Sequence, residues 1–484
     1  MNRIQALFRR SHLWLALGLT MFVLSHGSVT VPICSWFAFV FLIRYHRTSA
    51  RPWLSILTIW IGMSACYEIV FSGLGVPLSG GLFHTVCLLM AAVGALPFLV
   101  DGCFYRKLRG AAATLVWPLT MVTISFFTLA YVPSLADAQV EYPPLIQIVS
   151  ITGAGGLVFL IYWFAAVLNQ IWESGGDWQC VKKEGSLLLG ALMLVLAYGE
   201  TRLALASSQE ETLPVAMISE KANSYRDLRT YQLEDLEGLF RLSQEAADEG
   251  ARVIAWAEGS AETPRGKEEE LIERGKEFAK SNEVYLFMSV ISHPASGLSE
   301  NKTVGISPDG QIVVDYLKAN LVPGLETHLK KGDGVVAAAN IDGVRTGHVI
   351  CYDIDFPAYI RQAGRSGVDV LFAPSSDWRA IRRFHARPAR IRAVENGCSL
   401  VRPTIQGLSI ATDPYGRVLA CQDYFSDGPR LTIVEVPTSG VPTFYASHGD
   451  LFSHASIALL AILAGVACLR GSITREPTQT LAQR

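Results

Sequence analysis

The stretch Gly347-His348-Val349-Ile350-Cys351-Tyr352-Asp353 decides the predicted fold, because in it a short apolar run ends on a thiol. Two earlier runs have the same form. Val253-Ile254-Ala255-Trp256-Ala257-Glu258 ends on a carboxylate, and Asp315-Tyr316-Leu317-Lys318 ends on an ammonium group. Such short apolar runs are typical of β-strands. We therefore expect the acid, the amine and the thiol to converge on one rim, where three strands give way to loops.

These three groups can act together on a carbonyl. A thiol attacks only as a thiolate, so Cys351 needs a base or a positive charge nearby. Glu258 can take its proton, and Lys318 can stabilise the oxyanion of a tetrahedral intermediate, helped by a backbone N–H after the cysteine. Taken singly, each residue has a plainer interpretation: a buried structural cysteine, a strand-end cap and a solvated lysine.

The composition of the 484 residues narrows the class of protein. Half of the residues are apolar and the mean hydropathy is +0.30, which is high for a soluble enzyme. The net charge of −2 argues against a nucleic-acid partner. The nine cysteines form no CxxC pair and no Cys/His ligand spacing, so the sequence predicts no zinc, iron–sulfur or redox role for them. A disulfide between Cys398 and Cys421 remains an alternative in an oxidising compartment.

Apolar stretches divide the chain into three predicted domains. Residues 1–206 form a membrane domain with about seven spans, 207–451 a water-soluble block, and 452–484 a last span and tail. The predicted spans, of which the first is an uncleaved anchor, are 12–26, 29–43, 53–73, 82–100, 111–132, 147–171, 186–206 and 452–469.

Basic residues predict the orientation. They lie in alternate loops and at both ends, whereas the loops near 73–81 and 132–146 contain no Lys or Arg. Positive loops face the cytoplasm, so we expect the block 207–451 to be periplasmic in a multi-pass protein of a bacterial inner membrane. The basic residues are Arg3, Arg9, Arg10, Arg44, Arg47, Arg51, Arg106, Lys107, Arg109, Lys182, Lys183, Arg470, Arg475 and Arg484.

The soluble block alternates strand and helix signals, which predicts a layered α+β or α/β domain. Helical spacing of apolar residues is found at 225–249, 265–281, 357–365 and 386–396. The expected strands lie at 213–218, 252–256, 285–291, 303–307, 312–316, 346–351, 368–373, 399–402 and 408–412.

Four motifs in this block resemble the nitrilase, or carbon–nitrogen hydrolase, superfamily. They are Trp256-Ala257-Glu258, Lys318-Ala319-Asn320-Leu321-Val322-Pro323, Cys351-Tyr352-Asp353 and Arg390-Ile391-Arg392-Ala393-Val394-Glu395-Asn396-Gly397. The resemblance implies an αββα sandwich with a Glu-Lys-Cys triad. The surrounding spans narrow the match to the membrane branch of the superfamily, the apolipoprotein N-acyltransferases. The segment 147–157 is similar to the part of that family that enters its sixth span.

The resemblance also implies roles and substrates. Glu258 resembles the general base, Lys318 the transition-state lysine, Cys351 the acyl-accepting nucleophile, and Glu326 an additional glutamate that orients the lysine. Such an acyltransferase takes an acyl chain from a phospholipid and passes it to the N-terminal amine of a lipoprotein. Its partners are then a phospholipid donor, a lipoprotein acceptor and membrane lipids, and we expect a monomer without metal or cofactor.

Several positions depart from the family pattern. Ala257 replaces a proline, Asp353 replaces a glutamate, and the run 321–326 lacks an aromatic residue. We take Tyr352, Asp353 and Trp378 as candidate substrate-binding residues. The departures keep open a membrane-anchored amidase that hydrolyses the C–N bond of a small amide, and a non-catalytic scaffold is a third possibility. Glu68, within a predicted span, is either functional or bonded to a neighbouring helix.

Overall fold

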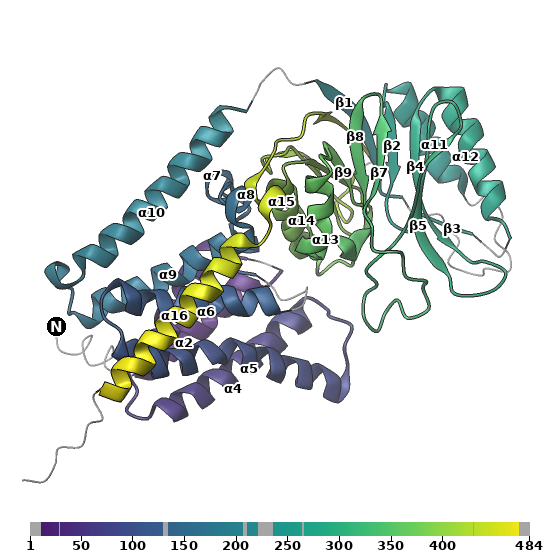
Figure 1. Cartoon of the computed structure of the whole chain (residues 1–484). Coiled ribbons are helices and arrows are strands. Elements are labelled where there is room, and N and C mark those ends of the chain that lie inside the picture. Colours follow the sequence, from purple (N-terminus) through teal and green to yellow (C-terminus); the bar gives the residue numbers. More distant parts are fainter. Residues whose placement is uncertain are drawn as a thin grey trace, which may run out of the picture. The chain divides into compact units, whose positions relative to one another are not determined.

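The computed structural model describes residues 11–28, 30–128, 134–206, 211–220, 236–263, 266–428 and 430–473 (Figure 1). The chain divides into two compact units. The first contains Met1–Gln139, Thr152–Tyr198 and Asp450–Arg484, and the second contains Val140–Ile151 and Gly199–Gly449. A short internal segment, Val140–Ile151, thus groups with the second unit.

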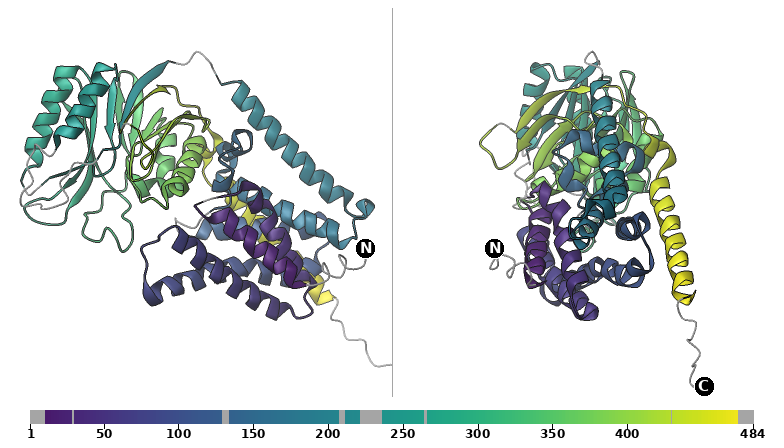
Figure 2. Two further views of the ribbon diagram at one scale, coloured as in Figure 1. Left: turned by 180° about the vertical axis from the view of Figure 1, so that it is seen from behind. Right: turned by 90° about the vertical axis from the view of Figure 1, so that its left-hand side faces the viewer.

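The first unit is helical, and most of its longer helices lie side by side (Figure 2). Each predicted span overlaps one long helix of the structure. Among the described residues, five helices are long and apolar enough to cross a membrane: Pro52–Gly73, Gly80–Phe104, Ala154–Glu173, Val181–Ala204 and Leu451–Arg470. The helices are α2 (Ser11–His26), α3 (Pro32–Thr48), α4 (Pro52–Gly73), α5 (Gly80–Phe104), α6 (Ala111–Phe127), α9 (Ala154–Glu173), α10 (Trp178–Ala204), which continues into the second unit, and α16 (Leu451–Ile473), with the 3-10 turns η1 (Tyr105–Lys107) and η2 (Asp137–Gln139).

The helix of the sixth predicted span begins later than the sequence predicted. Gly153 has a φ of 63°, which ends the preceding turns, and α9 begins only at Ala154. Residues before it form two single turns, α7 (Pro143–Ile146) and α8 (Val149–Thr152). The side-chain amide of Gln147 donates to the carbonyl of Tyr415 at 2.9 Å, and Arg390 pairs with Glu141 at 3.0 Å. These contacts explain why the segment belongs to the second unit.

Two β-sheets form the middle of the second unit. The first has the strand order β15-β1-β2-β4-β5-β6, with β3 beside β4, and the second has the order β14-β13-β11-β9-β8-β7. A small pair joins β10 (Ser375–Ser376) and β12 (Thr404–Ile405). The strands of the two sheets are β1 (Thr212–Ile218), β2 (Val253–Trp256), β3 (Ala261–Thr263), β4 (Tyr285–Ser292), β5 (Glu300–Ile306), β6 (Ile312–Leu317), β7 (Ala337–Ile341), β8 (Val344–His348), β9 (Val370–Phe372), β11 (Ser399–Arg402), β13 (Leu408–Thr412), β14 (Val418–Asp423) and β15 (Leu431–Pro437).

Helices cover the outer face of each sheet, as Figure 1 shows. One apolar cluster lies between the first sheet and α11 and α12, a second joins the two sheets, and a third lies under α13 and α14. The second unit is therefore an αββα sandwich, as the family resemblance implied. Its helices are α11 (Glu237–Asp248), α12 (Glu268–Asn282), α13 (Pro357–Arg365), α14 (Arg382–Asn396) and α15 (Phe444–His448), with the 3-10 turn η5 (Cys351–Asp355). The first part of the predicted helix 225–249, up to residue 235, lies outside the described residues.

The strand directions bring the strand ends to common edges. Strands β1, β2 and β4 are mutually parallel, and β6 follows two antiparallel pairings, so it runs parallel to β4. In the second sheet β8, β9 and β11 are also parallel. Because parallel strands end at the same edge, the loops that follow β2 and β6 share one edge, and those that follow β8 and β9 share another.

We expect Phe287→Ala to destabilise the sandwich, because this ring fills the space between the sheets. It is 2% exposed, and its centroid lies 4.6 Å from that of His348 and 4.9 Å from that of Phe372. Loss of such a ring costs about 3–5 kcal/mol, measurable as a lower thermal midpoint of the purified protein. Ile312→Ala, at an exposed position of β6, is the control and should change stability by less than about 0.5 kcal/mol. Equal effects of the two changes would contradict this account of the core.

Candidate active site

Cys351 lies on a strained turn. It is the first residue of η5, just after β8, and its φ is +49°. This left-handed conformation is uncommon for a residue with a side chain, and such outliers cluster at functional sites. The Cys351 amide donates to the carbonyl of Pro374 at 2.9 Å, and its sulfur lies 3.9 Å from the carbonyl oxygen of Ser376. The turn therefore fixes the sulfur against the loop that follows β9.

Glu258 and Lys318 form a buried ion pair. Lys318 Nζ lies 2.8 Å from Glu258 Oε1 and 2.6 Å from Glu326 Oε1. Glu258 also accepts hydrogen bonds from the side chain of Asn301 and from the backbone N–H of Ser376, both at 2.7 Å. The backbone N–H of Ser376 links the carboxylate to the segment that contacts the sulfur. The structure thus places three of the candidate residues in direct contact, with Cys351 against the same loop.

The charges of this group act on one another. Burial opposes the charge of Lys318, but Glu258, Cys351 and Glu326 together outweigh it and raise the pKa of the ammonium group. Burial raises the pKa of the Cys351 thiol well above its usual range, Glu258 raises it further, and Lys318 lowers it. The lysine therefore keeps its proton, and the thiol at rest keeps its own until a base removes it.

Glu326 bonds Lys318 from eight residues further along the chain. One carboxylate oxygen pairs with Lys318, and the other accepts the backbone N–H of Val322 at 2.7 Å. The carboxylate therefore fixes the lysine to its own loop, a position consistent with an orienting role.

Asp353 is enclosed by hydrogen-bond donors. One oxygen accepts the backbone N–H of Asn320 at 2.7 Å and its side-chain amide at 3.0 Å. The other accepts the hydroxyl of Tyr316 at 2.6 Å and the backbone N–H of Ile350 at 2.9 Å. A carboxylate has about four acceptor positions, so these bonds fill it. Asp353 ties the turn of Cys351 to the loop of Lys318, which is the placement of a positioning residue.

The other two candidate substrate-binding residues lie beside these loops. Tyr352 is buried and packs edge-to-face on Phe356, with ring centroids 5.1 Å apart. Burial, with a smaller contribution from Asp355, raises the pKa of Tyr352 to about 12. Trp378 is partly exposed and follows Asp377 directly. Tyr352 directly follows Cys351 in η5, and Trp378 lies two residues after Ser376, whose carbonyl contacts the sulfur.

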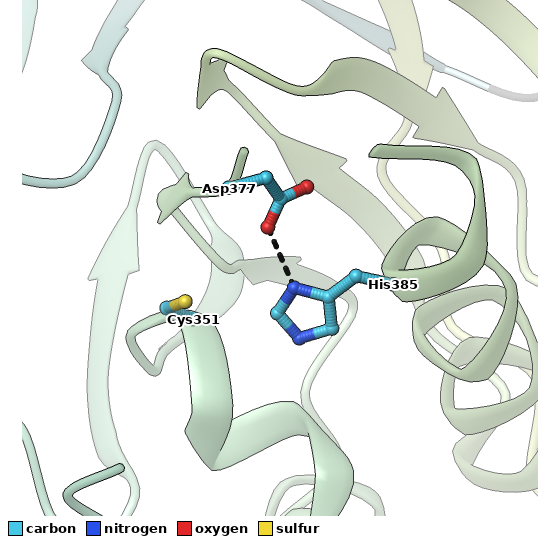
Figure 3. A group of neighbouring side chains, drawn as sticks. All are labelled: Cys351, Asp377 and His385. Carbon is cyan, nitrogen blue, oxygen red and sulfur yellow. Dashed lines mark hydrogen bonds and ion pairs between the residues drawn. The ribbon is translucent and has the colours of Figure 1, made fainter. Parts of the chain in front are cut away.

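The sequence did not identify five residues of this site. Asn301 and Ser376 hold Glu258, while Asp377, His385 and Arg402 form a buried group beside Cys351. Figure 3 shows the hydrogen bond between His385 Nδ1 and Asp377, 2.7 Å long, with the cysteine alongside. None of these residues belongs to the four motifs that carry the family resemblance. No spacing in the sequence relates them to the cysteine.

The group also resembles a small metal site. The sulfur of Cys351, a carboxylate oxygen of Asp377 and a ring nitrogen of His385 lie within 4.8 Å of one another. However, Arg402 Nη2 lies 3.1 Å from both oxygens of Asp377 and 2.9 Å from His385 Nδ1. A guanidinium cation already neutralises the carboxylate at this point, so the donor set does not fit a metal ion.

The sequence is similar to one described family and to several known proteins. Residues 229–443 match the sequence family described as Carbon-nitrogen hydrolase. The chain is 26% identical to the Apolipoprotein N-acyltransferase of Geobacter metallireducens, over 98% of this chain and 99% of that protein. It is 32% identical to the 2-oxoglutaramate amidase of Bacillus subtilis, over 30% of this chain and 60% of that protein. An amidase structure from Nesterenkonia sp. aligns with a TM-score of 0.43 and 17% identity, over 52% of this chain and 98% of that one.

Residues 229–443 therefore form a domain of the carbon–nitrogen hydrolase, or nitrilase, superfamily. Within it, the similarity that extends over both units is to the apolipoprotein N-acyltransferases, the membrane branch expected from the sequence.

We expect Asp353→Asn to weaken the site through its positioning loops. The amide cannot accept all four hydrogen bonds, so at least one buried donor loses its partner, at a cost of about 1–3 kcal/mol. The thermal midpoint of the purified protein should fall. Asp315→Asn is the control, because Asp315 is an exposed residue of β6. If both variants unfold at the wild-type temperature, Asp353 does not hold these loops.

Proposed function

We propose that this protein transfers an acyl chain from a phospholipid, through a thioester on Cys351, to the N-terminal amine of a membrane lipoprotein. The observation that supports the proposal most is the buried Glu258–Lys318 pair, which shares the loop of Ser376 with the cysteine sulfur. The full-length similarity to Apolipoprotein N-acyltransferase supports the choice of substrates over other acyl-transfer reactions.

The first step forms the thioester. Glu258 accepts the proton of the Cys351 thiol, and the sulfur attacks the ester carbonyl of the donor. The carbonyl electrons move to the oxygen, where Lys318 and a backbone N–H after the cysteine stabilise the negative charge. The C–O bond to the lipid then breaks, the departing alkoxide takes the proton from Glu258, and a lysophospholipid leaves.

The second step transfers the acyl group. The neutral amine of the acceptor attacks the thioester carbonyl, and Glu258 accepts a proton from the amine nitrogen. The C–S bond breaks, the acyl group remains on nitrogen as an amide, and the thiolate recovers its proton from Glu258. In this scheme Glu326 and Asp353 hold the lysine and the nucleophile turn in position, and Tyr352 and Trp378 bind the substrates.

A membrane location follows from the same proposal, because the donor is a membrane lipid and the acceptor is a lipoprotein held in the membrane. Five helices among the described residues have the length and composition of spans. Together with the alternation of basic loops in the sequence, this supports a multi-pass protein of a bacterial inner membrane with the catalytic unit in the periplasm.

The proposal predicts a covalent intermediate. Purified protein incubated with phospholipid should gain the mass of one acyl chain, and hydroxylamine should remove it because it cleaves thioesters. Cys351→Ala should abolish the gain, and Glu258→Gln should reduce its rate at least about a hundredfold, since general base catalysis contributes about 10²–10⁴-fold. Intact-protein mass spectrometry measures both.

Cys421→Ala is the matched control, because Cys421 is an exposed cysteine of the same unit, and it should keep the acyl adduct. An unchanged adduct in Cys351→Ala would refute the assignment of the nucleophile. Turnover of a small amide without any transfer from phospholipid would favour the membrane-anchored amidase instead. That second candidate is supported by the similarity to 2-oxoglutaramate amidase.

The topology can be tested with cysteines that the chain already has. Cys421 and Cys103 are both exposed, and they lie in different units. In spheroplasts, a membrane-impermeant maleimide should label Cys421, whereas Cys103, next to a basic loop, should react only after detergent lysis. Peptide mass spectrometry assigns the labelled sites. Labelling of Cys103 with protection of Cys421 would reverse the proposed orientation.

A further inference from the structure

His385 occupies a buried position that the Glu-Lys-Cys chemistry does not use. It lies near the start of α14, and a ring nitrogen is within 4.8 Å of the Cys351 sulfur. Nδ1 is 2.7 Å from Asp377, and Nε2 is 3.4 Å from Asp355 Oδ2. The side chain is 6% exposed, and those of both carboxylates are equally or more buried. The imidazole therefore lies between two acids, and Figure 3 shows it with Asp377 and Cys351.

The geometry favours the doubly protonated ring. A neutral imidazole has one donor nitrogen and one acceptor nitrogen. Here Nδ1 bonds Asp377 and Nε2 lies 3.4 Å from Asp355, and an ionised carboxylate can only accept, so the two acids favour a donor at each nitrogen. The guanidinium of Arg402, 2.9 Å from Nδ1, opposes this. Burial lowers the pKa of His385, but Asp377 and then Asp355 outweigh it and raise the pKa to about 9, against the opposing charge of Arg402.

The sulfur needs positive charge near it. Burial and Glu258 both raise the pKa of the Cys351 thiol, and Asp377 raises it as well, while Lys318 lowers it. Arg402 Nη2 bonds Asp377 at 3.1 Å, and His385 bonds the same carboxylate. An opposite charge within about 4–6 Å stabilises an ionised group. A protonated His385 therefore both screens Asp377 and acts on the thiolate.

We propose that His385 supplies a second positive charge beside the Cys351 sulfur, in addition to Lys318, and that this charge makes thiolate formation depend on the protonation of the imidazole. The proposal rests on the proposed function only in taking Cys351 as the nucleophile.

Among the described residues, the charged or titratable groups that contact His385 come from three parts of the fold. Cys351 and Asp355 belong to η5, Asp377 to the loop after β10, and Arg402 to β11. The protonation of His385 sets the direction in which pH changes thiolate formation. Below the pKa of about 9 the imidazolium is present and supports the thiolate. Above it, the proton is lost, and with it the charge beside the sulfur.

The test measures thiolate reactivity directly. Wild-type protein and His385→Asn, both full-length and in detergent, are alkylated with iodoacetamide from pH 6.5 to 10.5, and peptide mass spectrometry follows Cys351. We expect the wild type to react about tenfold faster below pH 8, since a nearby opposite charge lowers a pKa by about one or more. The ratio should fall towards one above pH 10. The substituted amide can still donate to Asp377, which preserves that contact.

Two further variants separate charge from structure. Asp355→Asn keeps the imidazole but lowers its pKa, so its rate should match the wild type near pH 7 and fall below it between pH 8 and 9. This variant also provides the test if His385→Asn does not fold. His448→Asn, at an exposed histidine of α15, should match the wild type throughout.

A wild-type to His385→Asn ratio that stays constant over the pH range, or equals one throughout, would overturn the proposal, as would parallel profiles for Asp355→Asn and the wild type. Alkylation needs neither a phospholipid nor an acceptor. If acyl transfer fails while the pH-dependent ratio holds, the proposed substrates are wrong and the role of His385 stands.

Discussion

The buried pair of Glu258 and Lys318 is the interaction on which the rest of the catalytic unit depends. Two ions removed from water lose several kcal/mol each, and their attraction compensates only if further hydrogen bonds satisfy them. Here Asn301, Ser376 and Glu326 supply these bonds. The pair therefore joins four segments of the sandwich: the loop after β2, the loop after β6, the start of β5, and β10. Loss of one member would leave an uncompensated charge in the interior.

The same arrangement controls the chemistry of the sulfur. Cys351 adopts a left-handed backbone conformation, and its turn is held by the four hydrogen bonds of Asp353 and by the carbonyl of Pro374. A strained backbone conformation persists only where the contacts around the residue hold it in place. The result is a thiol that burial keeps protonated, close to a carboxylate that can take the proton and to cations that can stabilise the thiolate.

Charge balance extends beyond Glu258, Lys318 and Cys351. Asp355 and Asp377 bring two negative charges close to His385, and Arg402 brings a positive one. These four side chains are buried and come from η5, a loop, α14 and β11. Buried charged networks of this kind are stable only when every member has a partner. The site thus combines two linked networks, one around Lys318 and one around His385, with the sulfur between groups of both.

The sequence itself predicted much of the secondary structure. Local apolar patterns predicted the helices of the first unit and nearly all central strands, because periodicity and strand length are properties of neighbouring residues. The Glu-Lys-Cys group stays a prediction of the family resemblance, and the structure places each member within three residues of the end of its own strand. Only the tertiary structure decided that Val140–Ile151 joins the catalytic unit, that Asp353 faces four donors, and that His385 lies beside Cys351. These relations join residues far apart along the chain, and they depend on strand order and helix placement, which leave no spacing in the sequence.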